Sequence, residues 1–228
     1  MALKRLLYIL ILCATAVGAE CETKGVQSKF RKVPADSVYQ STTIKFDLGS
    51  AAYLPIRHKG DVQTYDFAAS VRLFQKFFPT VEAGYAQARL TDYYGNNLYR
   101  GYGGFIRLGA DYSVLKKYKG ENHLLVGLRV ATSLQGYGYP ALTRTGDYWQ
   151  SDKASYSRLF GADAWGEIVA GVQVQIYKGF NMGWFLRYKI LMTRGKTLDG
   201  IVRPAYILGY GQRDDTAFGW NYYIGWTF

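Results

Sequence analysis

Charged side chains recur at alternate positions of several apolar stretches, with acidic and basic residues in nearly equal numbers. These residues are Lys45, Asp47, Asp66, Arg72, Glu82, Arg107, Asp111, Arg129, Glu167, Arg187 and Lys189. Charges that are removed from water together must pair, because a buried charge without a partner costs roughly 3–5 kcal/mol. The chemistry indicated is a network of ion pairs and hydrogen bonds on a common inner face. The alternative is a narrow path for water or ions.

Patterns for catalysis or metal binding are weak. The two histidines are His58, near Asp61, and His123, at the start of a predicted strand. Neither has a serine close in the sequence in the arrangement that nucleophilic catalysis requires. The adjacent Asp214 and Asp215 do not match the ligand spacing of a metal site. We therefore expect no enzyme, no cofactor and no metal.

The charged residues lie in stretches where large apolar residues occupy every second position. In "NMGWFLRYKILM", Trp184, Leu186 and Tyr188 alternate with Arg187 and Lys189. Such alternation predicts a strand with one apolar and one polar face. Eight strands are predicted in this way, at residues 43–54, 64–74, 80–86, 105–112, 123–133, 166–177, 181–192 and 216–228.

The predicted connections alternate in length. Short ones cover residues 76–79, 115–122 and 178–180, and long ones cover residues 89–102, 135–161 and 193–215. Short turns at one end and long loops at the other are typical of outer-membrane barrels, whose tilted strands span a bilayer with about 9–11 residues. A soluble β-sandwich is the alternative, but the apolar face is nearly free of charge on all the predicted strands. The predicted fold class is all-β, an eight-stranded antiparallel transmembrane β-barrel (up-and-down meander) with short periplasmic turns and long outer loops.

The N-terminus resembles a secretory signal. Lys4 and Arg5 precede the apolar run "LLYILILCATAV", and small residues precede a predicted cleavage after Ala19. The run is short for a transmembrane helix, which is the alternative. The predicted organisation is a signal peptide at 1–19, a flexible periplasmic N-terminal segment at 20–40 and an outer-membrane β-barrel at 41–228.

The cysteines provide no disulfide framework. Cys13 lies within the predicted signal peptide, which leaves Cys21 alone in the mature chain. Whether Cys21 is lipidated stays open.

The stretches "GWFLRYKILM" and the terminal "FGWNYYIGWTF" carry a resemblance to known proteins. The sequence resembles small OmpA-type eight-stranded outer-membrane barrels, and more closely an uncharacterised family of outer-membrane proteins of the Bacteroidota. The resemblance implies that the outer-membrane assembly machinery recognises the last strand. The residues of this C-terminal insertion signal are Tyr222, Ile224, Trp226 and Phe228.

A tyrosine flanked by glycines occurs three times, at Tyr102, Tyr137 and Tyr210. A tyrosine ring can cover the bare backbone of a glycine on a neighbouring strand, and tyrosine suits a membrane interface. These tyrosines are predicted to form the outer rim of the barrel. The long outer loops are where recognition would take place.

The net charge of +11 and the absence of a nucleic-acid motif favour lipid phosphates over nucleic acid as partners. The mean hydropathy of −0.13 agrees with strands rather than apolar helices as membrane segments. The predicted function is a non-catalytic structural protein, or an accessory of an outer-membrane assembly, with a lumen plugged by side chains. A narrow channel is the alternative, and a lipid-modifying enzyme is the weakest interpretation. The expected partners are outer-membrane lipids, the assembly machinery and other outer-membrane proteins.

Overall fold

The structure is a computed structural model that describes residues 38–53, 61–91, 98–115, 122–145, 151–193 and 203–228, without the side chains of residues 53 and 141–154. All of these residues belong to one compact unit. None of the helices among them is long and apolar enough to cross a membrane. The predicted signal peptide 1–19 and most of the predicted segment 20–40 lie outside the described residues. The first strand begins at Tyr39, so that the end of the predicted flexible segment is already part of the sheet.

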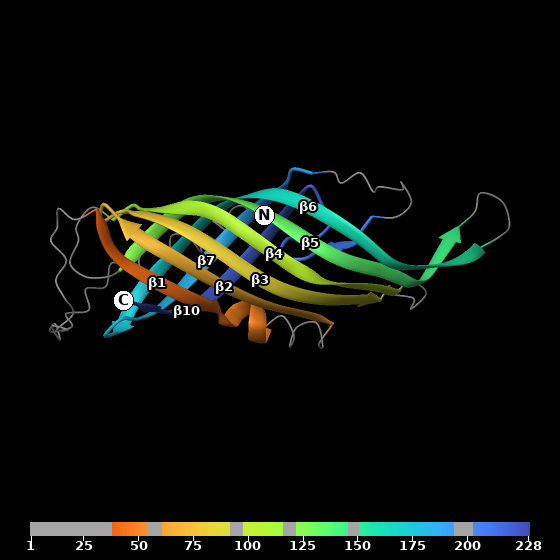
Figure 1. Cartoon of the computed structure of the whole chain (residues 1–228), viewed down its shortest axis with the longest axis horizontal. Helices are drawn as coiled ribbons and strands as arrows, with labels where there is room; N and C mark the ends of the chain where they lie inside the picture. The colour runs from red at the N-terminus through yellow and green to blue at the C-terminus, as the bar shows by residue number, and fades with distance from the viewer. Residues whose placement is uncertain (1–37, 54–60, 92–97, 116–121, 146–150, 194–202) are drawn as a thin grey trace, which may run out of the picture. The chain divides into compact units, whose positions relative to one another are not determined.

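Eight antiparallel strands form a closed ring in an up-and-down meander, which confirms the predicted all-β class and strand order (Figure 1). The strands of the ring are β1 (Tyr39–Asp47), β2 (Val62–Leu73), β3 (Phe77–Thr91), β4 (Leu98–Ser113), β5 (His123–Thr145), β6 (Ser151–Tyr177), β7 (Phe180–Leu191) and β10 (Thr216–Thr227). β10 returns to pair with β1 and closes the ring. β8 (Tyr206–Ile207) and β9 (Gly211–Gln212) form a separate hairpin.

The strands are strongly staggered around the ring. Paired residues followed from Ile44 through β2, β3, β4, β5, β6 and β7 lead to Thr216 of β10. Ile44 itself pairs with Trp226, so one circuit shifts the register by ten residues, from Trp226 to Thr216. Such a stagger requires tilted strands, and a barrel of eight strands has an interior just wide enough for its side chains.

Tight turns reverse the chain at the end of the barrel where Phe228 lies, which we call the turn end. Lys178 and Gly179 connect β6 to β7, with φ angles of 26° and 92°. Both residues are in the left-handed region, which is the geometry of a two-residue hairpin loop and favours glycine. The opposite end of the barrel is called the loop end.

The turn between β2 and β3 covers residues 74–76, so the predicted connection at residues 76–79 begins two residues and ends three residues too late. Pro79, the last residue of the predicted connection, belongs to β3. It pairs with Ala110 of β4 and has no registered partner in β2. A proline is tolerated at such a gap in the ladder because no hydrogen bond needs its missing N–H.

β1 is shorter than the predicted strand 43–54. It ends at Asp47, and Gly49–Tyr53 form a π-helical turn, η1, which lies beside the barrel wall partway along its length (Figure 1). The Asp47 carboxylate accepts a hydrogen bond from the backbone N–H of Tyr222 at 3.1 Å. A side chain therefore satisfies a β10 donor that a longer β1 would have bonded through a backbone carbonyl.

β5 and β6 are much longer than predicted and extend as a hairpin beyond the other strands (Figure 1). The predicted loop 135–161 is therefore wrong, except for residues 146–150, which lie outside the described part of the chain. The alternation simply continues: Leu134 is 69% exposed, whereas Gln135 and Tyr137 are 2% and 3% exposed. The predicted loop 89–102 is shortened in the same way, because β3 reaches Thr91 and β4 begins at Leu98.

The barrel wall is apolar outside and polar inside. On β5, Leu128 and Val130 are 66% and 60% exposed, whereas Arg129 between them is 4% exposed. Large apolar side chains exposed on the other strands include Ile44, Phe67, Val81, Leu108, Ile168, Leu186 and Phe218. A continuous apolar surface of this kind is uncommon on monomeric soluble proteins.

Candidate functional site

Glu82 lies inside the barrel and binds three guanidinium groups. Its carboxylate is 3.0 Å from Nη1 of Arg107 and 3.0 Å from Nη2 of Arg187. It also pairs with Nη1 of Arg129. The four side chains come from four different strands, and none is more than 4% exposed. One carboxylate therefore joins β3, β4, β5 and β7 across the interior.

Two further carboxylates share the same arginines. Asp66 Oδ2 is 2.5 Å from Nη1 of Arg107. Glu167 bridges two arginines, with Oε1 at 3.1 Å from Nε of Arg107 and Oε2 at 2.7 Å from Nη1 of Arg187. Trp165 also donates its Nε1–H to Glu167 at 2.7 Å. Charge-assisted hydrogen bonds of this kind are roughly twice as strong as neutral ones.

Asp111 completes what we call the central cluster. Both of its oxygens accept from Nη2 of Arg129, at 2.8 and 3.1 Å, and Thr80 donates to it at 3.3 Å. The central cluster consists of Asp66, Glu82, Arg107, Asp111, Arg129, Glu167 and Arg187. Its carboxylates outnumber its guanidiniums by one. Lys45 and Lys189 are also buried in the interior.

The remaining predicted residues lie around the central cluster. Asp47 is 0% exposed, accepts from Tyr222 as described and also accepts from Nδ2 of Asn221. Arg72 donates from Nε to the carbonyl of Gln75 at 3.3 Å, which ties the wall to the β2–β3 turn. All the residues predicted for the polar network are thus buried inside the barrel, with exposed fractions of 7% or less.

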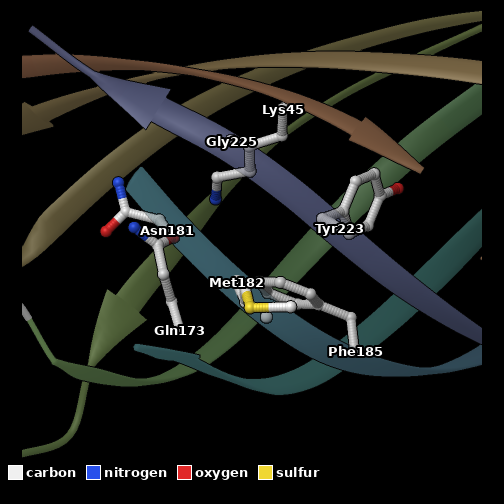
Figure 2. Close-up of a pocket in the computed structure, with 8 residues that line it drawn as sticks. Lys45, Gln173, Asn181, Met182, Phe185, Tyr223 and Gly225 are labelled. Carbon is white, nitrogen blue, oxygen red and sulfur yellow. The ribbon is translucent and has the colours of Figure 1, made fainter. Parts of the chain in front are cut away.

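A small cavity lies in the turn-end half of the interior. Figure 2 shows Lys45, Gln173 and Asn181 on one side of it and the ring of Phe185 on the other. The oxygens Oε1 of Gln173 and Oδ1 of Asn181 are buried, and the described residues provide no hydrogen-bond partner for either. The volume of about 10 Å³ and the polar lining suit a single water molecule.

The main feature that the sequence did not reveal is a segment folded into the loop end of the barrel. Residues 203–215, which we call the plug segment, contain the β8–β9 hairpin. Ile207 and Leu208 are 0% exposed, and they pack in one apolar cluster with Phe105 and Trp165 of the wall. Much of the predicted outer loop 193–215 is therefore interior, and residues 194–202 lie outside the described part.

Backbone carbonyls of the plug segment bind the charged wall. Lys189 donates to the carbonyls of Gly209 and Tyr210 at 2.7 and 3.0 Å, and Nη2 of Arg107 donates to Gly209 at 3.1 Å. Gly209 has a φ of 78°, and a Cβ there would lie 2.7 Å from the ring of Phe105. Only glycine fits this position, because both the backbone conformation and the ring exclude a side chain.

Side chains of the wall also hold the hairpin. Gln135 donates to the carbonyl of Tyr206 at 3.2 Å and accepts from the N–H of Leu208 at 3.0 Å. Tyr210 donates its phenol O–H to the carbonyl of Asp214 at 2.6 Å, and burial raises the pKa of this phenol. The plug segment thus has fixed hydrogen-bond partners on both of its arms.

The three tyrosines predicted to form the rim take different positions. Tyr102 is 55% exposed, and its ring lies 3.0 Å from where a Cβ of Gly136 would be, as expected for aromatic cover of a glycine. Tyr137 also covers a glycine, Gly161, but it is 3% exposed and faces inward. Tyr210 is 2% exposed within the plug segment. The rim prediction is wrong for Tyr137 and Tyr210. Tyr137 lies on an inward-facing position of β5, and Tyr210 is buried with the apolar residues of the plug segment.

A serine and a histidine meet on adjacent strands, which the sequence search missed because they are ten positions apart. Oγ of Ser113 lies 3.3 Å from Nδ1 of His123. The residues are 0% and 2% exposed, and the rings of His123 and Phe78 pack edge to face. A substrate has no access to this serine in the structure. Over the described residues, no group of three or more His, Cys, Asp and Glu is placed to hold a metal ion, and His58 lies outside them.

The predicted insertion-signal residues lie on the closing strand. Phe228 exchanges two backbone hydrogen bonds with Thr42 of β1, at 2.9 and 3.3 Å. Phe228 and Trp226 are 65% and 42% exposed, and Tyr222 and Ile224 are half-buried. The strand is therefore a full member of the wall, and recognition of its end by other proteins stays a prediction.

The fold and the interior define a class of protein: a closed antiparallel barrel whose interior is filled by ion pairs and by an inserted segment. The chain belongs to the family described as a domain of unknown function, DUF6048, whose model matches residues 3–228. No curated protein and no solved structure matches the chain significantly.

Proposed function

We propose that this chain is a non-catalytic barrel of the outer membrane, exported through a cleaved signal peptide and akin to the small OmpA-type barrels of the Bacteroidota. The apolar outer wall supports this proposal, because exposed Leu128, Val130 and their counterparts on the other strands would contact acyl chains. The strands of the ring have 9 or more residues, enough to span a bilayer when tilted. The turn end would face the periplasm and the loop end the exterior.

The observation that carries the function is the closed interior. The central cluster crosses the barrel at exposures of 4% or less, and the plug segment packs inside the loop end. An ion would have to displace paired charges, each held by two or more partners. Such an interior suits a structural protein or an accessory of a membrane assembly better than a pore.

The contact surface of this accessory would be the long β5–β6 hairpin, which projects beyond the other strands (Figure 1). Other outer-membrane proteins are the proposed partners there, and lipids cover the wall. The assembly machinery would engage the end of β10 at Phe228. Catalysis is not proposed, since the Ser113–His123 pair is buried.

A narrow channel is the second candidate. The way the plug segment is held favours it. Side chains of the wall donate hydrogen bonds to the carbonyls of Tyr206, Gly209 and Tyr210, and water could replace these donors. Withdrawal of the plug segment would leave the central cluster as the remaining barrier.

Conductance of the purified full chain in planar bilayers separates the two candidates. We expect the wild-type protein to show no ion current, and a variant with residues 206–212 replaced by a glycine–serine linker to show brief openings. Heat-dependent gel mobility serves as the control that both proteins are folded barrels. Steady wild-type current equal to that of the variant would establish the channel and refute the closed lumen.

A further inference from the structure

A larger cavity lies at the loop end, beside the plug segment. It has a volume of about 380 Å³ and is lined by Leu191, Arg203, Arg213, Asp214 and Asp215. Leu191 ends β7, and Arg213 to Asp215 lead directly into β10, so that the cavity lies where these two wall strands meet the plug segment. Its volume is within the range of about 300–1,000 Å³ that is typical of small-molecule sites.

Arg213 has spare hydrogen-bonding capacity. Its Nη2 lies 3.2 Å from Oδ1 of the buried Asp163, yet both of its Nη atoms are buried and neither makes a directed hydrogen bond within the described residues. A guanidinium offers five N–H donors in a planar fork that matches the oxygens of a phosphate or carboxylate. Arg203 brings a second guanidinium to the same cavity, and its backbone is fixed by a 2.5 Å hydrogen bond from Tyr139 to its carbonyl.

The opposite sign is present in the same cavity. Asp214 and Asp215 contribute carboxylates, and their backbone carbonyls are fixed by hydrogen bonds from Tyr210 at 2.6 Å and from the N–H of Leu191 at 3.0 Å. A simple anion would meet repulsion from these carboxylates. A ligand that carries an anionic group and, a few bonds away, a cationic or hydroxyl donor would satisfy both kinds of lining residue.

Leu191 faces the interior of the barrel, where it packs against the apolar cluster that includes Trp165. Its neighbours Ile190 and Met192 lie on the opposite face of β7 and are 43% and 61% exposed, and Phe218 on β10 is 76% exposed. A ligand with an acyl chain could place its polar group in the cavity and pass its chain over the end of β7 to this part of the outer wall.

We propose that this cavity binds a phosphate ester that also bears an amine, with the phosphate at Arg203 and Arg213 and the ammonium at Asp214. The source is a zwitterionic lipid headgroup or a free phosphorylated amine. The lipid source rests on the proposed membrane location, whereas the chemistry of the cavity does not.

The test uses the folded full chain in detergent, with binding of phosphoethanolamine, inorganic phosphate and ethanolamine measured by calorimetry. We expect phosphoethanolamine to bind at least tenfold more tightly than either fragment. Arg203→Gln should weaken phosphoethanolamine binding about tenfold, the effect of one lost charge-assisted hydrogen bond. Arg203 is preferred to Arg213 for this test because it is exposed and its loss leaves the Asp163 pair intact.

Two matched variants make the result specific. Arg100→Gln removes another exposed arginine, on β4 away from the cavity, and should leave binding unchanged. Asp214→Asn should reduce the preference for phosphoethanolamine over phosphate without weakening phosphate binding. Equal affinities for phosphoethanolamine and phosphate, or wild-type affinity in Arg203→Gln, would overturn the proposal.

The source is resolved in nanodiscs that contain phosphatidylethanolamine or phosphatidylglycerol, followed by native mass spectrometry of retained lipid. Selective retention of phosphatidylethanolamine, lost in Arg203→Gln, identifies a lipid site. Binding of phosphoethanolamine without retained lipid identifies a soluble ligand at the same site. A protein that shows the heat-dependent mobility shift but binds neither would refute this site while leaving the proposed membrane barrel standing.

Discussion

The central cluster and the plug segment close the same barrel by different means. Members of the central cluster are side chains of wall strands, so that the pairing of β3, β4, β5 and β7 fixes where Glu82 and its arginines meet. The plug segment is a separate stretch of chain, which the wall holds largely through backbone carbonyls such as that of Gly209. The cluster is therefore part of the wall itself, whereas we expect that the plug segment can be altered with the wall left in place.

Glu82→Gln should have the largest effect, because it removes the carboxylate shared by three arginines. We expect the free energy of unfolding to fall by about 3–5 kcal/mol, the usual cost of leaving buried charges without their partner. Urea titration of the folded barrel in detergent, followed by heat-dependent gel mobility, measures this loss.

The control for Glu82 is Asp61→Asn, which removes the charge of an exposed carboxylate at the start of the β2 region. Exposed substitutions of this kind change stability by about 0.5 kcal/mol or less. If both variants unfold at the same urea concentration, the central cluster contributes no more to the free energy of unfolding than an exposed charge does. The proposed difference between the central cluster and the plug segment would then be wrong.

Gly209→Ala tests the plug segment with an intermediate expected effect. The φ of 78° and the nearby ring of Phe105 should force the segment out of position, at a cost of about 1–3 kcal/mol. We expect the wall to remain folded while the bond after Arg213 becomes cleavable by trypsin.

Gly104→Ala is the matched glycine substitution, because a Cβ there meets its nearest atom at an ordinary 3.5 Å. It should leave the trypsin pattern unchanged. Full unfolding of Gly209→Ala at low urea would show instead that the plug segment is as integral to the fold as the central cluster.

The alternation of apolar and polar residues was sufficient to predict which charges face inward. Strand geometry sends successive side chains to opposite faces, so Arg129 between Leu128 and Val130 can only face the interior once those two face outward. The same rule does not predict which inward-facing charges form ion pairs. Glu82 pairs with arginines 25, 47 and 105 positions away in the sequence, and these pairs depend on the register of the strands.

The plug segment and the end of β1 could not be predicted for a different reason. Each depends on a side chain from another part of the chain that bonds a backbone group. The carboxylate of Asp47 accepts from the N–H of Tyr222, and the ammonium of Lys189 donates to the carbonyl of Gly209. In the sequence, residues 203–215 have the length and composition of an ordinary loop. Their inward path depends on Gln135 and Lys189, which lie on other strands.

Phe228→Ala should have the smallest effect on stability and the sharpest effect on assembly. The side chain is 65% exposed, and the backbone pair with Thr42 does not need it, so we expect the free energy of unfolding to change by about 0.5 kcal/mol. If the assembly machinery recognises the end of β10, the fraction inserted into membranes in cells should nevertheless fall severalfold. Phe77→Ala, which removes a 42% exposed phenylalanine at the same end on β3, should change stability equally and insertion not at all. Equal insertion of the two variants would show that Phe228 is an ordinary residue of the wall and not part of an insertion signal.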